Sequence, residues 1–512
     1  MNRPVRVRFA PSPTGPLHLG GMRTALYNYL FAHKMGGTFV LRIEDTDQNR
    51  FVAGAEQYIT ESLKWAGIEP SEGDLYGGNY GPYRQSDRKH LYKAYADQLI
   101  ASGHAYIAFD TKEELEAMKL RFATHENPSP SYNYATRSTM QNSLTINTED
   151  VKDRIAKGEP YVVRIKVPLN EEIGFHDLIR EHVVFNSSQV DDKVIFKSDG
   201  MPTYHLANVV DDYLMEISHV IRGEEWLSST PIHVLLYRYL GWEEKMPQFA
   251  HLPLILKPDG NGKLSKRDGD RLGFPVFPLN WTNPETGEAS QGYRERGFEP
   301  EAFINFLALL GWNPGTDQEI FSKEVLIQAF SIEKISKSGA KFDFEKTKWF
   351  NEQFLRGLSN EALIERVLPF VQQKYPEKAS EINFLTQVCS LMRDRITYAE
   401  EVVTKGYFFF EHPQYSSENL AKIAPSIQQD FVLMLQDLFE NNKSGHPELL
   451  EIELKALAGE AQVKAGDMMK FLRISIVGEL SGPSVPELII LLGAETVNKR
   501  LSACLEQLKN KH

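Results

Sequence analysis

The sequence of 512 residues predicts an α/β protein that is followed by an all-helical C-terminal region. Residues 5–10 and 38–44 alternate apolar and polar side chains, which is the period of a strand, and the pattern between them is helical. Residues 252–256 are apolar and indicate a further, buried strand. From about residue 350 onward, nearly every pattern is that of an amphipathic helix. A chain of this length is expected to form two to four domains.

The segment that joins the first strand to the first helix has the features of a phosphate site. Pro11 and Pro13 end the strand, because proline cannot extend a ladder of hydrogen bonds. The helical spacing begins at Gly20, and the resulting strand–helix–strand crossover is expected to be right-handed and parallel. Free backbone N–H groups at the start of a helix attract anions, and glycine lets a phosphate approach closely.

Two side chains of opposite charge end the two strands of this unit. Arg8 is expected to end the first strand and Glu44 the second. In an open parallel sheet, ligands bind outside the carboxyl ends of the strands, so we expect both residues to face one crevice. Taken singly, such charges are more often solvated, and a lone His18-x-Gly20 is more often a turn histidine beside a helix cap.

A second phosphate element is predicted after the strand at 252–256. Gly260 and Gly262 make the following loop mobile, and Lys263, Lys266 and Arg267 place three cations within five residues. A run of this kind alone is more often a solvated basic loop. Phosphoryl and nucleotidyl transfer nevertheless need such an element, because their catalysis consists mostly of positioning and of neutralising charge on phosphate oxygens.

The composition excludes several classes of protein. Cys389 and Cys504 are the two cysteines and lie far apart, so neither a disulfide framework nor a Cys-x-x-Cys metal site is expected. No run of about 18 uncharged apolar residues and no apolar secretory segment is present, so we expect a cytoplasmic protein without a membrane span. The net charge of −12 argues against a generally basic nucleic-acid coat but allows a local RNA-binding patch.

Both phosphate elements resemble known signatures. His18-Leu19-Gly20-Gly21 resembles the HIGH signature of class I aminoacyl-tRNA synthetases, and residues 263–267 resemble their KMSKS signature. Further segments are similar to bacterial glutamyl-tRNA synthetases, and the similarity runs from the N-terminus to near Trp349 and more loosely to the end. These segments are residues 8–15, 42–47, 81–86, 202–212 and 221–226.

The resemblance implies a fold and a division into domains. It implies a class I Rossmann-type catalytic domain with an α/β connective insertion, followed by an all-α anticodon-binding region; glutaminyl enzymes carry β-barrels in that last position. The expected domains are a catalytic domain split between residues 1–85 and 200–260, a connective or acceptor-stem-binding insertion at 86–199, a KMSKS loop and stem-contact domain at 261–349, and the helical region at 350–512.

The resemblance also implies an activity. The expected reaction is ATP-dependent activation of L-glutamate to glutamyl-adenylate, followed by transfer of glutamate to the 3′-terminal adenosine of tRNA-Glu. ATP is then a substrate, Mg²⁺ accompanies it, and the partners are tRNA-Glu, L-glutamate and ATP, bound by a monomer. Whether tRNA-Gln is also charged stays open.

Residue roles follow from the same resemblance. Arg8 and Arg222 match ligands of the glutamate carboxylates, Glu44 matches the acceptor for the α-ammonium, and His18 and Lys266 match the catalytic contacts to the phosphates. The complete set for glutamate is Arg8, Ala10, Ser12, Glu44, Tyr204, Asn208 and Arg222. The set for ATP is His18, Gly20, Glu225, Trp226, Leu254, Ile255, Lys263 and Lys266. The candidates for tRNA are Asp47, Arg393 and Arg395, and the choice between the two arginines for the anticodon stays open.

Two segments depart from the family pattern. Many relatives carry a cysteine zinc site in the insertion, but Ala108 and Asp110 stand where thiolates would be, and His125 alone cannot build a tetrahedral site. We therefore expect no zinc and no other protein-bound metal. The link at residues 270–292 is longer than in most relatives, and its prolines and aromatic residues predict an ordered surface loop beside the lysine loop, with no role assigned.

Three other functions fit the sequence less well. A short enzyme of the same superfamily that glutamylates a modified tRNA nucleoside lacks the helical C-terminal half. A small-molecule nucleotidyltransferase with a His-x-Gly-His signature would carry histidine where this chain has Gly21. A catalytically inactive tRNA-binding protein would not be expected to keep both signatures.

Overall fold

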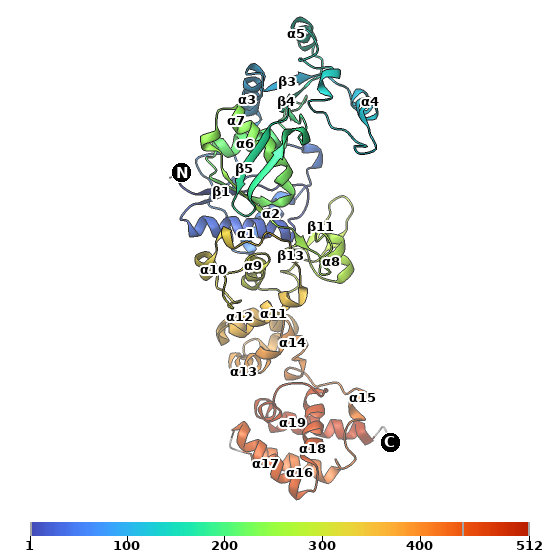
Figure 1. Cartoon of the computed structure of the whole chain (residues 1–512). Coiled ribbons are helices and arrows are strands. Elements are labelled where there is room, and N and C mark those ends of the chain that lie inside the picture. Colours follow the sequence, from blue (N-terminus) through green and yellow to red (C-terminus); the bar gives the residue numbers. More distant parts are fainter. Residues whose placement is uncertain (1–2, 443–444, 510–512) are drawn as a thin grey trace. The chain divides into compact units, whose positions relative to one another are not determined.

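The computed structural model describes residues 3–442 and 445–509. The chain forms two compact units, Met1–Thr347 and Lys348–His512, and Figure 1 follows its elements along the sequence. No helix among these described residues is long and apolar enough to span a membrane.

A six-stranded sheet forms the centre of the first unit, in the order β2-β1-β8-β9-β5-β6. All neighbours are parallel except the antiparallel pair β5 and β6. Helix α1 (Leu19–Lys34) connects β1 to β2, which confirms the predicted parallel strand–helix–strand unit. The strands are β1 (Arg6–Phe9), β2 (Thr38–Leu41), β5 (Glu172–Asp177), β6 (Glu181–Asn186), β8 (His219–Gly223) and β9 (Gln248–Leu252).

The order of the strands creates a crevice between β1 and β8. From β1 the chain crosses to β2 on one side, while β8 pairs with β1 on the other side, with Val7 opposite His219. Such a switch point at the carboxyl ends of parallel strands is where open α/β sheets bind ligands. Arg8 on β1 therefore lies at the edge that the sequence predicted, and Arg222 on β8 lies at the same edge.

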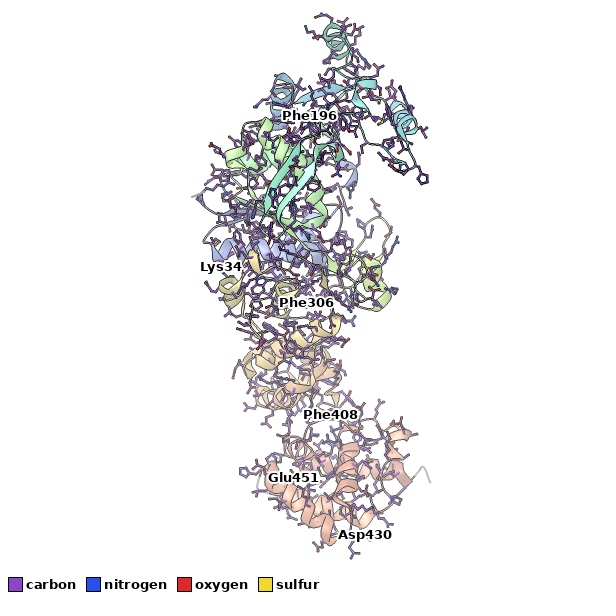
Figure 2. The ribbon with its side chains drawn as sticks, viewed as in Figure 1. Lys34, Phe196, Phe306, Phe408, Asp430 and Glu451 are labelled. Carbon is purple, nitrogen blue, oxygen red and sulfur yellow. The ribbon has the colours of Figure 1, made fainter. Side chains whose placement is uncertain are left out.

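Helices cover this sheet and close the core around it. Helix α1 packs against β1, β2 and β8, and also against α9 (Pro300–Leu309) and α10 (Lys323–Ala329). Helices α6 (Tyr204–Leu214) and α7 (Thr230–Tyr239) pack against each other. Phe306 on α9, labelled in Figure 2, is buried in this region. The further helix α2 spans Ala55–Trp65.

The range 86–199 contributes to two sheets. The antiparallel order β3-β4-β7 forms a small sheet of its own, but β5 and β6 extend the central sheet through the pairing of β5 with β9. Part of the range expected to form an insertion therefore belongs to the main sheet, and the exact domain limits stay predictions. The other elements of this range are α3 (Lys89–Ala101), β3 (Ala105–Ala108), α4 (Lys112–Phe122), α5 (Thr148–Ala156), β4 (Val162–Ile165) and β7 (Val194–Phe196).

Hydrogen bonds link the segment around Asp110 to the segments around Tyr132 and Asn142. Tyr132 donates its hydroxyl proton to Asp110 Oδ2 at 2.9 Å, and the amide of Asn142 donates to the same hydroxyl at 3.0 Å. The guanidinium carbon of Arg164 lies 3.9 Å from the centre of the Tyr132 ring. In residues 3–442 and 445–509, no group of three or more His, Cys, Asp or Glu is placed to hold a metal ion.

The segment after β9 carries the lysine loop and the long link. Strand β10 (Ile255–Leu256) pairs with β13 (Ala340–Lys341), and α8 (Lys266–Leu272) begins at the second lysine of the loop. Within residues 270–292, β11 (Trp281–Thr282) and β12 (Ala289–Ser290) form an antiparallel hairpin. The aromatic ring of Trp281 contacts the ring of Tyr58 edge-on, with 5.2 Å between their centroids.

The described part of the second unit contains helices and no strands, as the sequence predicted. Its core is one apolar cluster that includes Cys389, Cys504 and Phe408, the last labelled in Figure 2. Burial raises the pKa of the Cys389 thiol to about 12 and of the Cys504 thiol to about 11, so both behave as apolar core residues. The helices are α11 (Phe344–Gly357, which begins in the first unit), α12 (Asn360–Lys374), α13 (Ile382–Met392), α14 (Glu401–Thr404), α15 (Ser417–Leu420), α16 (Gln429–Asn441), α17 (Pro447–Glu460), α18 (Ala465–Val477) and α19 (Val485–Lys509).

Candidate active site

Two adjoining cavities lie at the crevice between β1 and β8. The first, here called the amino-acid cavity, has a volume of about 370 Å³ and is lined by Arg8, Glu44 and Arg222. The second, here called the nucleotide cavity, has a volume of about 530 Å³ and is lined by the start of α1 and by the lysine loop. Ser12, Gly20, Gly223 and Glu225 line both cavities, so ligands in the two cavities would lie next to each other.

The structure brings together the whole set of residues predicted to bind the amino acid. These residues come from the ends of β1, β2 and β8 and from the first turns of α6, although they are separated by up to 214 positions in sequence. Arg8, Ala10, Ser12, Glu44, Tyr204, Asn208 and Arg222 all line the amino-acid cavity.

Arg8 is one of the two arginines predicted to bind a substrate carboxylate. Its positive charge is balanced by a buried carboxylate of the protein. Its Nε donates to Asp212 Oδ1 at 3.0 Å, and Arg42 donates to the same oxygen at 2.7 Å. Arg42 also donates to Glu44 Oε1 at 2.8 Å. Burial alone would raise the pKa of Asp212, but the two guanidinium charges and their hydrogen bonds lower it below its ordinary value. Two arginines and two carboxylates thus balance each other.

Arg42 and Asp212 were missed as site residues, although both lie in segments that resembled the family. Arg42 is fully buried and Asp212 is 2% exposed. A charge inside an apolar strand or helix pattern is the signal that could have revealed them, because such charges are seldom buried without a partner.

Arg222 has a different environment. Its Nε donates to His251 Nε2 at 3.1 Å, one Nη donates to the Tyr204 hydroxyl at 2.9 Å, and the other donates to Thr230 Oγ1 at 2.8 Å. Arg222 is only 5% exposed. These partners carry no negative charge, so within the part of the chain that the structure describes no carboxylate contacts Arg222 directly.

Three histidines surround Arg222 and are neutral near pH 7. Burial lowers the pKa of His233 well below its ordinary value, and the positive charge of Arg222 lowers it further. Burial, Lys193 and Arg222 together lower the pKa of His205 to about 4. The pKa of His251 is also lowered to about 4 by burial, although its hydrogen bond to Asp177 acts in the opposite direction.

The nucleotide cavity receives most of the residues predicted for ATP. His18, Gly20, Glu225, Leu254, Ile255, Lys263 and Lys266 line it. Trp226 does not: its ring lies against Tyr204, with 4.4 Å between the centroids, and it lines the amino-acid cavity. The short 3-10 helix Glu224–Ser229 that follows β8 carries Trp226 to that side.

His18 presents a hydrogen-bond donor in the nucleotide cavity. It is the N-cap of α1, and its Nδ1 accepts the backbone N–H of Gly20 at 3.4 Å. Burial, and secondarily Lys263, lower its pKa to about 4, so the ring is neutral and its single proton is on Nε2. Nε2 is buried and has no hydrogen-bond partner among the residues that the structure describes. This N–H is therefore suited to donate to a phosphate oxygen.

Both lysines of the loop are held by carboxylates. Lys263 Nζ lies 3.1 Å from Glu225 Oε1, and Lys266 Nζ lies 2.9 Å from Glu288 Oε2. Glu288 belongs to the hairpin in the long link, and Trp281 of that hairpin also lines the nucleotide cavity. Partly exposed ion pairs of this kind contribute at most about 1 kcal/mol each, so phosphate oxygens can replace the carboxylates at low cost.

The three candidates for tRNA lie in different settings. Asp47 is exposed and lines a third cavity of about 410 Å³, which shares Glu44 and Tyr204 with the amino-acid cavity. In the second unit, Arg393 is half-buried and donates to the backbone carbonyls of Arg356 and Leu358, whereas Arg395 is exposed.

Two family models match the chain. The model described as "tRNA synthetases class I (E and Q), catalytic domain" matches residues 4–349. The model described as "Anticodon binding domain" matches residues 362–505.

Curated relatives and solved structures match over nearly the full length. The glutamate–tRNA ligase of Cytophaga hutchinsonii is 52% identical and covers 100% of this chain and 99% of its own length. The glutamate–tRNA ligase of Parabacteroides distasonis is 52% identical, with 99% of each chain covered. A crystal structure of a glutamate tRNA ligase from Elizabethkingia meningosepticum in complex with its amino acid has a TM-score of 0.93 and 46% identity, over 99% of this chain and 100% of that one.

We expect the first unit to lose stability as the pH falls from about 7 to about 5. The unfolded chain would protonate His18, His205 and His251 near the ordinary histidine pKa of about 6.5, whereas their pKa values of about 4 keep them neutral in the fold. Unfolding therefore takes up protons between about pH 7 and pH 5. The stability that these neutral histidines contribute is fully present only above this pH range. Thermal unfolding followed by tryptophan fluorescence measures this, since only Trp349 of the six tryptophans lies in the second unit.

His205→Gln supplies the control, because it removes one of these protonation sites and is expected to flatten the pH dependence. A midpoint that stays constant or rises between about pH 7 and pH 5 would contradict the assigned neutral histidines.

Proposed function

This chain belongs to the class I tRNA synthetases of the glutamate and glutamine (E and Q) family, and we infer that it is a glutamate–tRNA ligase. Relatives named for that activity match its whole length. The observation that carries the amino-acid assignment is the buried Arg222, which lines the amino-acid cavity and is not contacted directly by any carboxylate among the described residues.

The reaction has two steps. The α-carboxylate of glutamate attacks the α-phosphorus of ATP, which forms glutamyl-adenylate and releases pyrophosphate. A hydroxyl of the terminal ribose of tRNA then attacks the activated carbonyl, which forms glutamyl-tRNA and releases AMP. Neither step needs a protein nucleophile, so the enzyme acts mainly by holding reactants in two cavities that share a wall.

We propose that the amino-acid cavity recognises glutamate by its charges. Arg8 and Arg222 bind the carboxylates, and Glu44 accepts the α-ammonium. The hydrogen bonds from Arg42 and Asn208 to Glu44 all end on Oε1, which leaves Oε2 for the ammonium. Glutamine would leave a buried arginine facing a neutral amide, which costs on the order of 2–5 kcal/mol.

We propose that His18 and Lys266 stabilise the charge that develops on the α-phosphate. His18 offers the unpartnered Nε2–H, and Lys266 moves from Glu288 to a phosphate oxygen. ATP enters as its Mg²⁺ complex. A preorganised donor acts strongly here because it is placed before charge develops on the reacting group.

For tRNA, we propose that Asp47 contacts the acceptor end and that Arg395, rather than the engaged Arg393, contacts the anticodon. The exposure of Asp47 beside the amino-acid cavity and of Arg395 in the helical unit supports this choice. A cytoplasmic location and a monomeric state, both predicted from the sequence, stay part of the proposal.

Replacing the loop lysine tests the proposed transition-state contact. Lys266→Ala is expected to lower the rate of tRNA-dependent pyrophosphate exchange by about 10²–10³-fold, the usual cost of removing one such donor. Arg271→Ala is the control, since Arg271 lies on the same helix but does not line the nucleotide cavity. Exchange near the wild-type rate in Lys266→Ala would remove this residue from the mechanism.

Charging of purified tRNAs tests the proposed function itself. We expect the enzyme to attach glutamate to tRNA-Glu in the presence of ATP, and a parallel reaction with tRNA-Gln determines whether it discriminates. Pyrophosphate exchange is expected to require tRNA. Absence of glutamylation of tRNA-Glu, or strong exchange without tRNA, would contradict the assignment.

A further inference from the structure

We propose that Asp177 and His251 form a relay that positions Arg222 for a substrate carboxylate without neutralising its charge. This inference rests on the proposed function, because it concerns how the same amino-acid cavity recognises glutamate. Neither Asp177 nor His251 was among the predicted site residues, and neither lines the cavity.

The three residues lie on three neighbouring strands. Arg222 is on β8, His251 is its register partner on β9, and Asp177 ends β5 on the far side of β9. Arg222 Nε donates to His251 Nε2 at 3.1 Å, and His251 Nδ1 lies 2.6 Å from Asp177 Oδ2. Asp177 and His251 are fully buried, so no water competes for these hydrogen bonds.

The backbone around Asp177 determines where the protons are. Asp177 Oδ1 accepts the backbone N–H groups of Ile179 and Arg180, each at 2.9 Å, and Oδ2 accepts that of His251 at 3.1 Å. Burial would raise the pKa of Asp177, but the hydrogen bonds from His251 and these backbone groups lower it below its ordinary value. An ionised Asp177 can only accept, so His251 must donate from Nδ1.

The proton on Nδ1 fixes the other nitrogen as an acceptor. A neutral imidazole carries one proton, so Nε2 presents a lone pair to the Nε–H of Arg222. Thr230 Oγ1 also lies 3.2 Å from Nε2, which keeps the ring in place. The guanidinium is thereby held along one edge, and its two Nη groups remain at the cavity side with Tyr204 and Thr230.

The relay differs in kind from the support of Arg8. Asp212 contacts Arg8 directly and compensates its charge, whereas a whole imidazole ring separates the Asp177 carboxylate from Arg222. A carboxylate in direct contact with Arg222 would compete with the substrate for the same charge. The relay therefore orients the guanidinium and leaves most of its charge for glutamate.

Asp177→Asn tests the assigned proton positions. An asparagine must keep its oxygen at the two backbone N–H groups and turn its NH₂ toward His251, which forces the ring proton onto Nε2, facing Arg222 Nε–H. The KM for glutamate in tRNA-Glu charging is expected to rise roughly 10- to 100-fold through loss of this charged hydrogen bond, while the KM for ATP stays within about twofold.

Two substitutions of His251 separate positioning from packing. His251→Gln can accept from Arg222 and donate to Asp177 through one amide, so it is expected to keep the KM for glutamate within about fivefold of wild type. His251→Leu fills similar space without either hydrogen bond, so it is expected to match the effect of Asp177→Asn. Equal effects of glutamine and leucine would overturn the relay.

Asp192→Asn is the matched control for damage to the fold. Asp192 is also fully buried and bonded to Tyr106 and Arg137, but it has no connection to Arg222. We expect it to lower the thermal midpoint without raising the KM for glutamate.

If Asp177→Asn instead raises the KM for glutamate and for ATP together, Asp177 is merely structural. If the wild type does not charge tRNA-Glu at all, the proposed function fails independently of the relay.

Discussion

A buried positive charge at the carboxyl end of β8 is the constraint around which the amino-acid cavity is built. Removing a guanidinium from water is costly unless hydrogen bonds and an opposite charge replace the water. Arg222 donates hydrogen bonds to Tyr204, Thr230 and His251, and among the described residues no carboxylate contacts it directly. A ligand that carries a carboxylate balances the remaining positive charge of Arg222. This explains how a small cavity can select an acid over its amide.

The strand order makes this arrangement possible. Because β1 is flanked by β2 and β8, the carboxyl ends of three parallel strands place Arg8, Glu44 and Arg222 around one cavity. The same edge carries the start of α1, where His18 and Gly20 border the nucleotide cavity. The two reactants of the activation step are thus brought together by one sheet edge, which lowers the entropic cost of their encounter.

Local sequence patterns were enough to predict the main secondary-structure units and which residues lie at the ends of the strands. The strand–helix–strand unit, the helical second unit and the cavity positions of Arg8, Glu44 and His18 follow from periodicity and from the rule that ligands bind at strand ends. Periodicity reports which side of an element is apolar, but it does not report which distant residue lies opposite. Asp177 and His251 are 74 positions apart, and Asp177 fell in a range assigned to an insertion because its pairing with β9 leaves no local signal.

The long link at residues 270–292 also shows that sequence patterns do not reveal tertiary contacts. Its aromatic residues predicted order, but its role depends on contacts that sequence does not display, namely Trp281 on Tyr58 and Glu288 on Lys266. The sequence also did not show the contact of the Trp226 ring with Tyr204, beside which Trp226 lines the amino-acid cavity. In each case the missing information is a tertiary contact and not a local conformation.

The discrimination of wild-type enzyme between glutamate and glutamine tests the central claim most directly. The measurement is the ratio of kcat/KM for the two amino acids in the charging of tRNA-Glu. An uncompensated Arg222 predicts a preference for glutamate of roughly 10²-fold or more, because glutamine leaves a buried charge unpaired. Glutamine used within about tenfold of the efficiency of glutamate would contradict the account, since such a small ratio means that the buried charge does not set the choice of substrate.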